Sequence, residues 1–428
     1  MIQAYLLTFN CARHLVNPDV LAPSFFNALP KAAAVPDIIV ISLQEIAPSA
    51  YSFLGGSYLK PYFDRITTTV HLATDIHSHG SERLEHVATR SLGMTALMIF
   101  AKPRITERIQ WVQAAGAGVG VWNMGNKGAV AMRIGLSSPR SEEGLILGFT
   151  AAHFAPMEWN VQARNKDWED LVRNLVFVAD DDSAYSFSEE APLWSSAQAP
   201  TVPTGLFCPG SHLFFAGDLN YRTCDTAPGP RAYTSYPKLS ASRGSPEHFL
   251  HWLENDQLNR ERSAKRTLHG LHELPIDFPP TYKYLVQKDA KSRGRTSPGD
   301  EVKWDWATHR YPSWCDRILY LPSPVSTSSL EPQMYTALPI QSTSDHRPVA
   351  LVVHINEQPL PLDAEDIRST PPFPINPQWR TRRDAARRCE IIVGVASYLA
   401  LTRTGNAAII TALTVSLASW FLVSWIKG

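Results

Sequence analysis

The chain has 428 residues, 44% of them hydrophobic and 19% charged, a composition typical of folded globular proteins. Its 40 basic and 40 acidic side chains cancel, so the molecule has no broad positive field for a polyanion, and we expect no nucleic-acid partner. The five cysteines lack the CxxC spacing of a zinc or redox motif, which indicates reduced thiols in a cytosolic domain. We expect the protein to be a monomer.

Apolar, β-rich runs recur along the chain and predict the strands of a sheet-rich core. Helical spacing between the runs predicts helices at Trp159–Val178 and Pro246–Gln257. Together these elements indicate an α/β sandwich with helices outside paired sheets. The predicted strands are Ala4–Phe9, Asp37–Leu43, Thr95–Ala101, Gly128–Ile134, Leu145–Ala152, His212–Ala216, Ile318–Leu321 and Val349–His354.

Two polar segments, Asp180–Pro203 and Lys288–Asp300, carry no sustained apolar period and are interpreted as surface insertions. Pro359–Pro377 is dense in proline, which favours an extended linker. We therefore expect one folded domain over residues 1–357, followed by a Pro-rich and then Arg-rich linker over residues 358–390.

Residues 391–428 are expected to anchor the chain in a membrane. No charge interrupts Ala407–Ile426, which reaches roughly the 20 residues that a helix needs to cross a hydrocarbon core. A buried core helix is the alternative, but uncharged stretches of this length are uncommon in soluble domains. The apolar run Ile391–Leu401 is too short to span alone; it can lie in the interface, pair with the tail, or extend one tilted helix.

A cluster of arginines precedes the apolar tail. By the positive-inside tendency it keeps this side of the membrane cytosolic, and it could meet anionic headgroups, although a solvated flank is the plainer alternative. We therefore expect a single-pass tail anchor with a cytosolic domain. The arginines are Arg380, Arg382, Arg383, Arg387 and Arg388.

The sharpest chemical signal is FFAGDLNYR, in which an apolar strand runs into a glycine turn that carries Asp218 and Asn220. In phosphate-ester hydrolysis a carboxylate can accept a proton from the attacking water, while an amide holds that water or a phosphoryl oxygen. A simple turn is the alternative for this fragment taken alone, because Gly, Asp and Asn all favour turns.

Other predicted strands also end in polar residues. Asn10 and Glu45 follow the first two strands, His153 follows the strand that ends at Ala152, and the pair Asp345 and His346 precedes the last strand. A carboxylate and an amide oxygen are hard ligands that suit Mg²⁺. The repetition of the pattern favours one site that is built from several strand ends, with Mg²⁺ as its cofactor.

A second block, RYPSWCDRIL, places Arg310 and Asp316 around a rigid Pro-x-Trp. Arginine contacts phosphate through several donors, and a buried carboxylate can fix the tautomer of a histidine. Tyr282 and Lys283, together with the pair Asn126 and Lys127, add groups that a multiply phosphorylated ligand needs, although each alone could be a surface residue.

These motifs, with SLQEI, GNKGAV, RNKDW, PPTYKY and SDHRPV, make the chain resemble the inositol polyphosphate 5-phosphatases of the endonuclease/exonuclease/phosphatase superfamily over almost all of residues 1–356. The resemblance implies a four-layer α/β/β/α sandwich that forms the catalytic domain, and Mg²⁺-dependent removal of the 5-phosphate. It further implies that Asn10 and Glu45 lie on the metal side and that Asp218 and Asn220 activate water. His153 and His346 would stabilise the phosphoryl centre.

By the same resemblance, Asp316 orients His346 with Asp345 nearby, and two further groups bind the headgroup. The 4-phosphate would contact Tyr282, Lys283 and Arg310, and the 1-phosphate would contact Asn126 and Lys127. Where many relatives have a lysine two residues before the arginine of the second block, this chain has Thr308, so one cation for the 4-phosphate is missing.

The tail resembles that of small fungal tail-anchored members of the family. That likeness implies the endoplasmic reticulum and phosphatidylinositol 4,5-bisphosphate in a membrane, which is converted to phosphatidylinositol 4-phosphate. Two alternatives stay open, namely the hydrolysis of soluble inositol polyphosphates and an inactive headgroup-binding adaptor.

Overall fold

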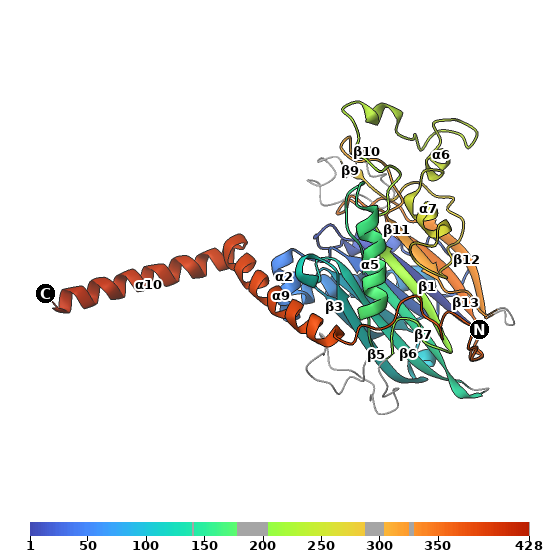
Figure 1. Cartoon of the computed structure of the whole chain (residues 1–428), viewed down its shortest axis with the longest axis horizontal. Coiled ribbons are helices and arrows are strands. Elements are labelled where there is room, and N and C mark those ends of the chain that lie inside the picture. The colour runs from blue at the N-terminus through green and yellow to red at the C-terminus, as the bar shows by residue number, and fades with distance from the viewer. Residues whose placement is uncertain (139–140, 178–203, 287–303, 325–328, 428) are drawn as a thin grey trace.

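Two mixed β-sheets form the centre of the molecule in a computed structural model that describes residues 1–138, 141–177, 204–286, 304–324 and 329–427 (Figure 1). The six-stranded sheet has the order β12 (Leu330–Ala337), β13 (Val349–Ile355), β1 (Ile2–Asn10), β2 (Ile38–Gln44), β4 (Thr95–Ala101), β3 (Glu85–Leu92). The five-stranded sheet has the order β11 (Asp316–Tyr320), β8 (Ser211–Asp218), β7 (Ser141–His153), β6 (Gly128–Ser138), β5 (Ile109–Gly118). A small pair joins β9 (Tyr284–Val286) to β10 (Trp304–Trp306).

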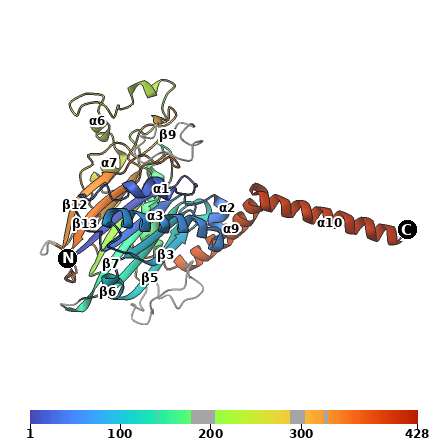
Figure 2. The same ribbon diagram turned by 180° about the vertical axis from the view of Figure 1, so that it is seen from behind.

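The two-residue period of the strands explains the layers, because successive side chains of a strand point to opposite faces of its sheet. Leu6 of β1 packs in the apolar core between the two sheets, together with residues of the five-stranded sheet such as Phe149. Its neighbour Leu7 packs in a second core with Phe63 and Ile66 of α3 (Lys60–Ser78). Figure 2 shows α3 and α1 (Pro18–Leu21) over this outer face.

The outer face of the five-stranded sheet is covered by α5 (Val161–Asn174), as Figure 1 shows. Trp168 and Leu171 of α5 are buried against Ala131 and Phe215 of that sheet. Helix, sheet, sheet and helix therefore stack in four layers, and the predicted sandwich with outer helices is confirmed.

The structure departs from the predicted elements in several places. The strands β3, β5, β9, β10 and β12 were not expected, and the single helix predicted at Pro246–Gln257 is wrong. Only a short helix, Leu250–Leu253, lies within that region. A second helix begins at its last residue, Gln257, where the Asp256 carboxylate accepts a hydrogen bond from Asn259 N at 2.9 Å and caps the new helix. The predicted insertions 180–203 and 288–300 lie outside the described residues. The short helices are α2 (Ser49–Leu54), α4 (Pro103–Thr106), α6 (Leu250–Leu253) and α7 (Gln257–Ser263), with 3₁₀ turns η1 (Ala22–Ser24), η2 (Gly56–Tyr58), η3 (Val121–Asn123) and η6 (Ala232–Ser235).

The C-terminal region also differs from the expected linker. The Pro-rich segment lies on the domain, where the buried Arg368 donates to Ser211 O at 2.9 Å. Residues 379–390, expected as the Arg-rich linker, are the first half of α9 (Trp379–Leu401), which packs on α2. After Thr402, whose backbone is extended, α10 (Arg403–Lys427) projects away from the body (Figure 1). Within the described part of the chain, α10 is the one helix that is long and apolar enough to cross a membrane, with a mean hydropathy of 1.9.

Candidate active site

The strand directions bring the predicted polar residues to one edge of the two sheets. β1 and β2 are parallel, and so are β7 and β8. The carboxyl ends of each pair therefore lie at the same edge of their sheet. The residues at these ends include Asn10, His153 and Asp218. β11 runs antiparallel to β8, so Asp316 at its start is paired directly with Asp218. Asn10 Nδ2 donates to Asp218 Oδ2 at 2.9 Å, which joins the edges of the two sheets.

Asp218 lies at the centre of this cluster and is almost fully buried. Its Oδ2 atom lies 3.3 Å from His153 Nε2 and 4.0 Å from His346 Nε2. Burial alone would raise the pKa of Asp218, but the hydrogen bond from His153 and the charges of His153 and His346 outweigh it and hold the pKa below its usual range. The carboxylate is therefore ionised at neutral pH.

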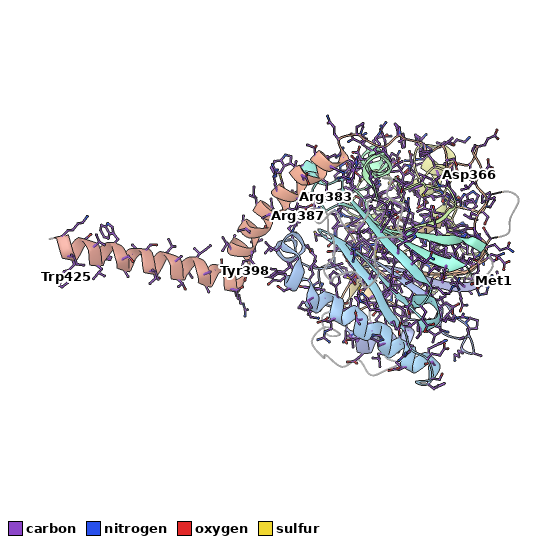
Figure 3. All side chains as sticks on the ribbon, turned by 90° about the horizontal axis from the view of Figure 1, so that it is seen from below. Met1, Asp366, Arg383, Arg387, Tyr398 and Trp425 are labelled. Atoms are coloured by element: carbon purple, nitrogen blue, oxygen red, sulfur yellow. The ribbon has the colours of Figure 1, made fainter. Side chains whose placement is uncertain are left out.

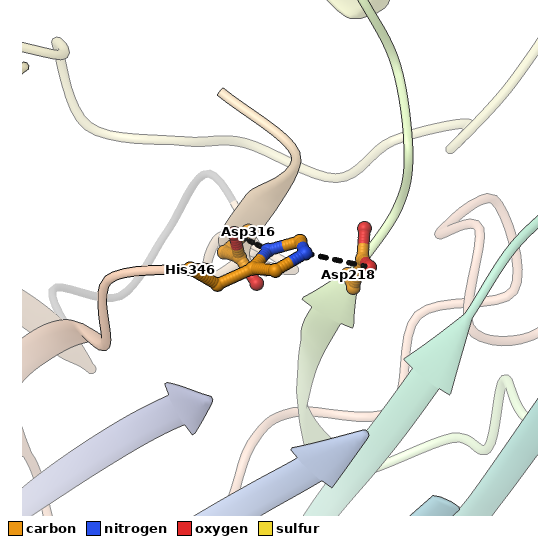
Figure 4. A group of neighbouring side chains, drawn as sticks. All are labelled: Asp218, Asp316 and His346. Carbon is orange, nitrogen blue, oxygen red and sulfur yellow. Dashed lines mark hydrogen bonds and ion pairs between the residues drawn. The ribbon is translucent and has the colours of Figure 1, made fainter. Parts of the chain in front are cut away.

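His346 lies between two carboxylates, as Figure 4 shows. Its Nδ1 atom is 2.8 Å from Asp316 Oδ2, and the other ring nitrogen faces Asp218. Thr281 Oγ1 donates to the same Asp316 oxygen at 2.7 Å and helps to fix it. Burial lowers the pKa of His346, but the charge and hydrogen bond of Asp316 and the charge of Asp218 raise it to about 9. The imidazole is consequently a cation at neutral pH.

The backbone around Asn220 holds Asp218 in place. Asn220 has a positive φ of 56°, and its backbone N donates to Asp218 Oδ1 at 3.1 Å. The Asn220 side chain donates to Phe154 O at 3.1 Å and accepts from Arg222 Nη2 at 2.5 Å. Both ends of the amide thus have partners in the protein, so the contacts of Asn220 fix the loop beside Asp218.

Asn10 and Glu45, the residues expected on the metal side, follow neighbouring parallel strands. Asn10 is paired with Gln44, the residue before Glu45. Glu45 Oε2 lies 3.2 Å from Arg13 Nε, and the negative charge of Glu45 acts on His153, which places Glu45 close to the same cluster. Amide and carboxylate oxygens are the ligands that Mg²⁺ prefers, so the chemistry of this donor set fits the ion.

A different trio also has the spacing of metal ligands. Ligand atoms of Asp218, Asp316 and His346 lie within 4.8 Å of one another. Asp316 Oδ1 is buried and has no hydrogen-bond partner among the described residues. The His346 ring occupies the space between the two carboxylates and pairs with Asp316, which favours an orienting role of Asp316 on the imidazole over Mg²⁺ binding by this trio.

The predicted phosphate-binding residues flank the cluster on two sides. Lys127 Nζ contacts His153 Nε2, and burial lowers the pKa of this lysine although Asp218 raises it. On the other side, Lys283 Nζ donates to Asp345 Oδ2 at 2.5 Å. The Tyr282 ring packs on that of His346 at a centroid distance of 4.6 Å.

Arg310 and Asn126 complete the two flanks. Arg310 Nε lies 3.9 Å from the buried Glu158 carboxylate, and the charge of Arg310 acts on Lys283, so these two cations share one region. Asn126 adjoins Lys127 in the loop before β6. Asn126 Oδ1 is buried without a hydrogen-bond partner in the part of the chain that is described.

Four residues that contact the cluster were not among the predicted site residues. Thr281 stands in the quoted motif PPTYKY, and Arg222 ends FFAGDLNYR, so their positions in motifs were a usable signal. Ser344, which donates to Asn10 O at 2.6 Å, precedes the noted Asp345 and His346. Glu158 follows no predicted strand directly, and its local sequence gives no signal.

The model of the endonuclease/exonuclease/phosphatase family 2 matches residues 7–352, which is most of the chain. The chain belongs to this family. The family predicted from the motifs is therefore confirmed. The family's type of sandwich is confirmed as well, because the chain is similar in structure to the inositol polyphosphate 5-phosphatase domain of SPsynaptojanin. The TM-score is 0.57 at 21% sequence identity, and the match covers 92% of this chain and 93% of that one. That domain was solved in complex with inositol (1,4)-bisphosphate and calcium ion.

Curated members of the family with similar sequences are 5-phosphatases and related enzymes. The phosphatidylinositol 3,4,5-trisphosphate 5-phosphatase 1 of Xenopus laevis is 29% identical over 61% of this chain and 22% of its own length. A polyphosphatidylinositol phosphatase of Saccharomyces cerevisiae is 28% identical over 73% of this chain and 23% of its own length. The chain thus spans less than a quarter of the length of these two relatives. By name the 5-phosphatases are phosphoric monoester hydrolases.

Proposed function

We propose that the chain is a phosphoinositide 5-phosphatase that converts phosphatidylinositol 4,5-bisphosphate to phosphatidylinositol 4-phosphate. The observation that carries the proposal is the position of Asp218, an ionised carboxylate that lies beside His153 and a cationic His346 at one edge of the sandwich. This arrangement pairs a proton acceptor with a positive group for a phosphoryl oxygen. The names of the relatives support the choice of the 5-phosphate.

In this proposal water attacks phosphorus and no protein nucleophile is used. Asp218 accepts a proton from the water, and Asn220 holds the loop that positions Asp218. The protonated His346, oriented by Asp316, donates to a phosphoryl oxygen, where negative charge develops. His153, whose pKa is lowered by burial and by the charge of Lys127, contacts Asp218 on the other side.

Asn10 and Glu45 are the residues that would hold Mg²⁺. When it is bound, the ion supplies Lewis-acid stabilisation of the charge on the phosphoryl oxygens. The Asn10 side chain also donates to Asp218, so the same residue ties the metal side to the proton acceptor.

The flanking cations account for recognition of the headgroup. Tyr282, Lys283 and Arg310 would bind the 4-phosphate, whose charge would replace that of Asp345 as the partner of Lys283. Asn126 and Lys127 would bind the 1-phosphate on the opposite side. A substrate with phosphates at both positions would therefore be held from two sides, with its 5-phosphate at Asp218.

The tail suits a substrate that lies in a membrane. We propose that α10 spans the bilayer of the endoplasmic reticulum as a single-pass anchor with the catalytic domain in the cytosol. Its length of 25 residues and the exposure of all its residues but Gly405 support this assignment. An anchored enzyme meets its lipid at a high effective concentration.

The test uses the full-length protein in detergent micelles with a complete panel of phosphoinositides, soluble inositol phosphates and an abasic DNA duplex. We expect magnesium-dependent phosphate release, fastest with phosphatidylinositol 4,5-bisphosphate, and no strand cleavage. Asp218→Asn should reduce kcat at least about a hundredfold, while Asp64→Asn, at an exposed site on α3, should leave it unchanged. Faster turnover of soluble inositol phosphates would favour the soluble alternative, and binding without turnover would favour the adaptor.

A further inference from the structure

Helix α9 packs against the catalytic domain through one face. Its buried residues Arg383, Ala386, Glu390 and Gly394 recur at helical spacing. A side chain at Gly394 would meet Phe53 Cβ of α2 at 3.0 Å, so glycine allows the close approach of the two helices. Figure 3 shows α9 beside the body, between the labelled Arg383 and Tyr398, with α10 leading away to Trp425.

The Glu390 carboxylate is fully buried and joins two parts of the molecule. On its own helix it accepts from Arg383, with Nη1 to Oε1 at 2.8 Å and Nη2 to Oε2 at 3.1 Å. On the catalytic domain, Gly125 N donates to Glu390 Oε1 at 2.9 Å. A buried ion pair costs desolvation energy and contributes little net stability, so a contact of this kind calls for a role other than stability.

Gly125 is the residue directly before Asn126 and Lys127, and it is held from both sides. While its N–H binds Glu390, its carbonyl accepts from Met94 N at 2.9 Å. The loop is closed by Val119 N, which donates to Lys127 O at 2.9 Å. The position of the Asn126 and Lys127 side chains therefore depends on an acceptor that α9 supplies.

We propose that Glu390 is a positioning residue for the loop that carries Asn126 and Lys127. Helix α9, which leads into α10, is on this view part of the substrate site: it holds the groups for the 1-phosphate, the phosphate by which the headgroup is attached to its lipid. The expected effect of Glu390 on turnover rests on the proposed function. The expected effect of Glu390 on the loop does not depend on that function.

Two matched double variants of the full-length protein in detergent micelles isolate the acceptor. Both replace Arg383 by Met and Glu390 by an uncharged residue, and both keep Arg387, whose Nη1 lies 3.4 Å from Glu390 Oε2 in the unaltered protein. One variant carries Glu390→Gln, which keeps an acceptor oxygen for Gly125 N. The other carries Glu390→Met, which has no such acceptor. Replacing both members of the buried pair avoids the large loss of stability that follows when one charge is left buried without its partner. Arg388→Ala, at an exposed position of the same helix, is the control.

The first measurement is hydrogen exchange in peptides that cover residues 119–128. We expect faster exchange with Glu390→Met than with Glu390→Gln, while Arg388→Ala matches the unaltered protein. Equal exchange in the two doubles would overturn the inference whether or not the protein has any activity.

The second measurement compares inositol 1,4,5-trisphosphate with inositol 4,5-bisphosphate, which lacks the 1-phosphate. For the trisphosphate, the Glu390→Met double should raise KM about fivefold relative to the Glu390→Gln double with little change in kcat. The bisphosphate should show no such difference, and the difference should also vanish when Asn126→Ala and Lys127→Met are added. A KM effect of equal size on both substrates would overturn the inference. If the unaltered protein turns over no substrate, the proposed function is overturned. The hydrogen-exchange result then decides alone whether Glu390 positions the loop.

Discussion

His346 Nδ1 lies 2.8 Å from Asp316 Oδ2, and this contact orients the opposite ring nitrogen toward Asp218. The contact is buried, which strengthens the attraction between the imidazolium and the two carboxylates. The relationship predicts both the strength and the pH dependence of catalysis.

Asp316→Asn should lower kcat about a hundredfold or more, because the amide can no longer favour the cationic, correctly oriented imidazole. The pKa of His346, about 9 with Asp316 in place, should fall in the variant. Since His346 acts as a cation, the loss of activity at high pH should begin at a lower pH than in the unaltered protein. The kcat profile between pH 6 and pH 10 measures both effects, and an unshifted alkaline limb would contradict the assigned role.

Lys283→Met should raise KM for substrates that carry a 4-phosphate and change KM little for phosphatidylinositol 5-phosphate. The reason is that Lys283 would lose a charge-assisted hydrogen bond to the 4-phosphate, worth about 1.5 to 3 kcal/mol. Phosphate release from the two lipids in mixed micelles gives the comparison. Lys238→Met, which removes an exposed lysine paired with Glu247, is the control and should affect neither lipid.

Thr308→Lys should act in the opposite direction to Lys283→Met. Thr308 is exposed and lies two residues before Arg310, so a lysine there adds a cation near the group proposed to bind the 4-phosphate. We expect a lower KM for phosphatidylinositol 4,5-bisphosphate and no change for phosphatidylinositol 5-phosphate. An equal gain for both lipids would indicate a general electrostatic attraction instead of a specific contact.

Removal of residues 403–428 should leave the hydrolysis of soluble inositol 1,4,5-trisphosphate unchanged, because every residue of α10 but Gly405 is exposed and α9 stays in place. The shortened chain should no longer sediment with lipid vesicles and should act more slowly on the lipid they contain. Sedimentation and phosphate release with the same vesicles test the two effects. Undiminished sedimentation would contradict the role of α10 as an anchor.

The buried Asp167 predicts a pH dependence of stability away from the reacting centre. Burial raises the pKa of its carboxyl to about 7, although Ala155 N donates to it at 2.8 Å. The folded state then binds more protons than the unfolded state between about pH 4 and pH 7, so the free energy of unfolding falls as pH rises through this window, by up to about 1.4 kcal/mol per unit. Chemical denaturation at several pH values should show a smaller fall for Asp167→Asn, and parallel curves would contradict the prediction.

Much of the site could be predicted because it is built from strand ends. Apolar, β-rich runs identified the strands that carry or precede Asn10, His153 and Asp218, and parallel pairing then brings their ends together. The family resemblance predicted that Asp316 orients His346, while the atoms that meet and their distance of 2.8 Å came from the structure. The roles of these residues, the magnesium ion and the membrane anchor stay predictions.

The C-terminal region could not be predicted in the same way. Arg383 and Arg387 were interpreted as part of a basic flank, because the sequence does not reveal that Glu390 turns Arg383 into a buried pair. The same holds for the helix predicted at Pro246–Gln257, where the cap formed by Asp256 depends on local geometry that helical spacing does not record. Contacts between distant segments, such as Gly125 with Glu390, leave no local pattern at all.

Thr402 alone separates α9, which is docked on the domain, from α10. With α10 in a bilayer, no long flexible linker would separate the anchor from the catalytic domain. The active site could then reach only the headgroups of the leaflet that faces the domain. The enzyme would then hydrolyse lipids of the membrane that holds its anchor. It could not reach lipids of a second membrane across a contact between organelles.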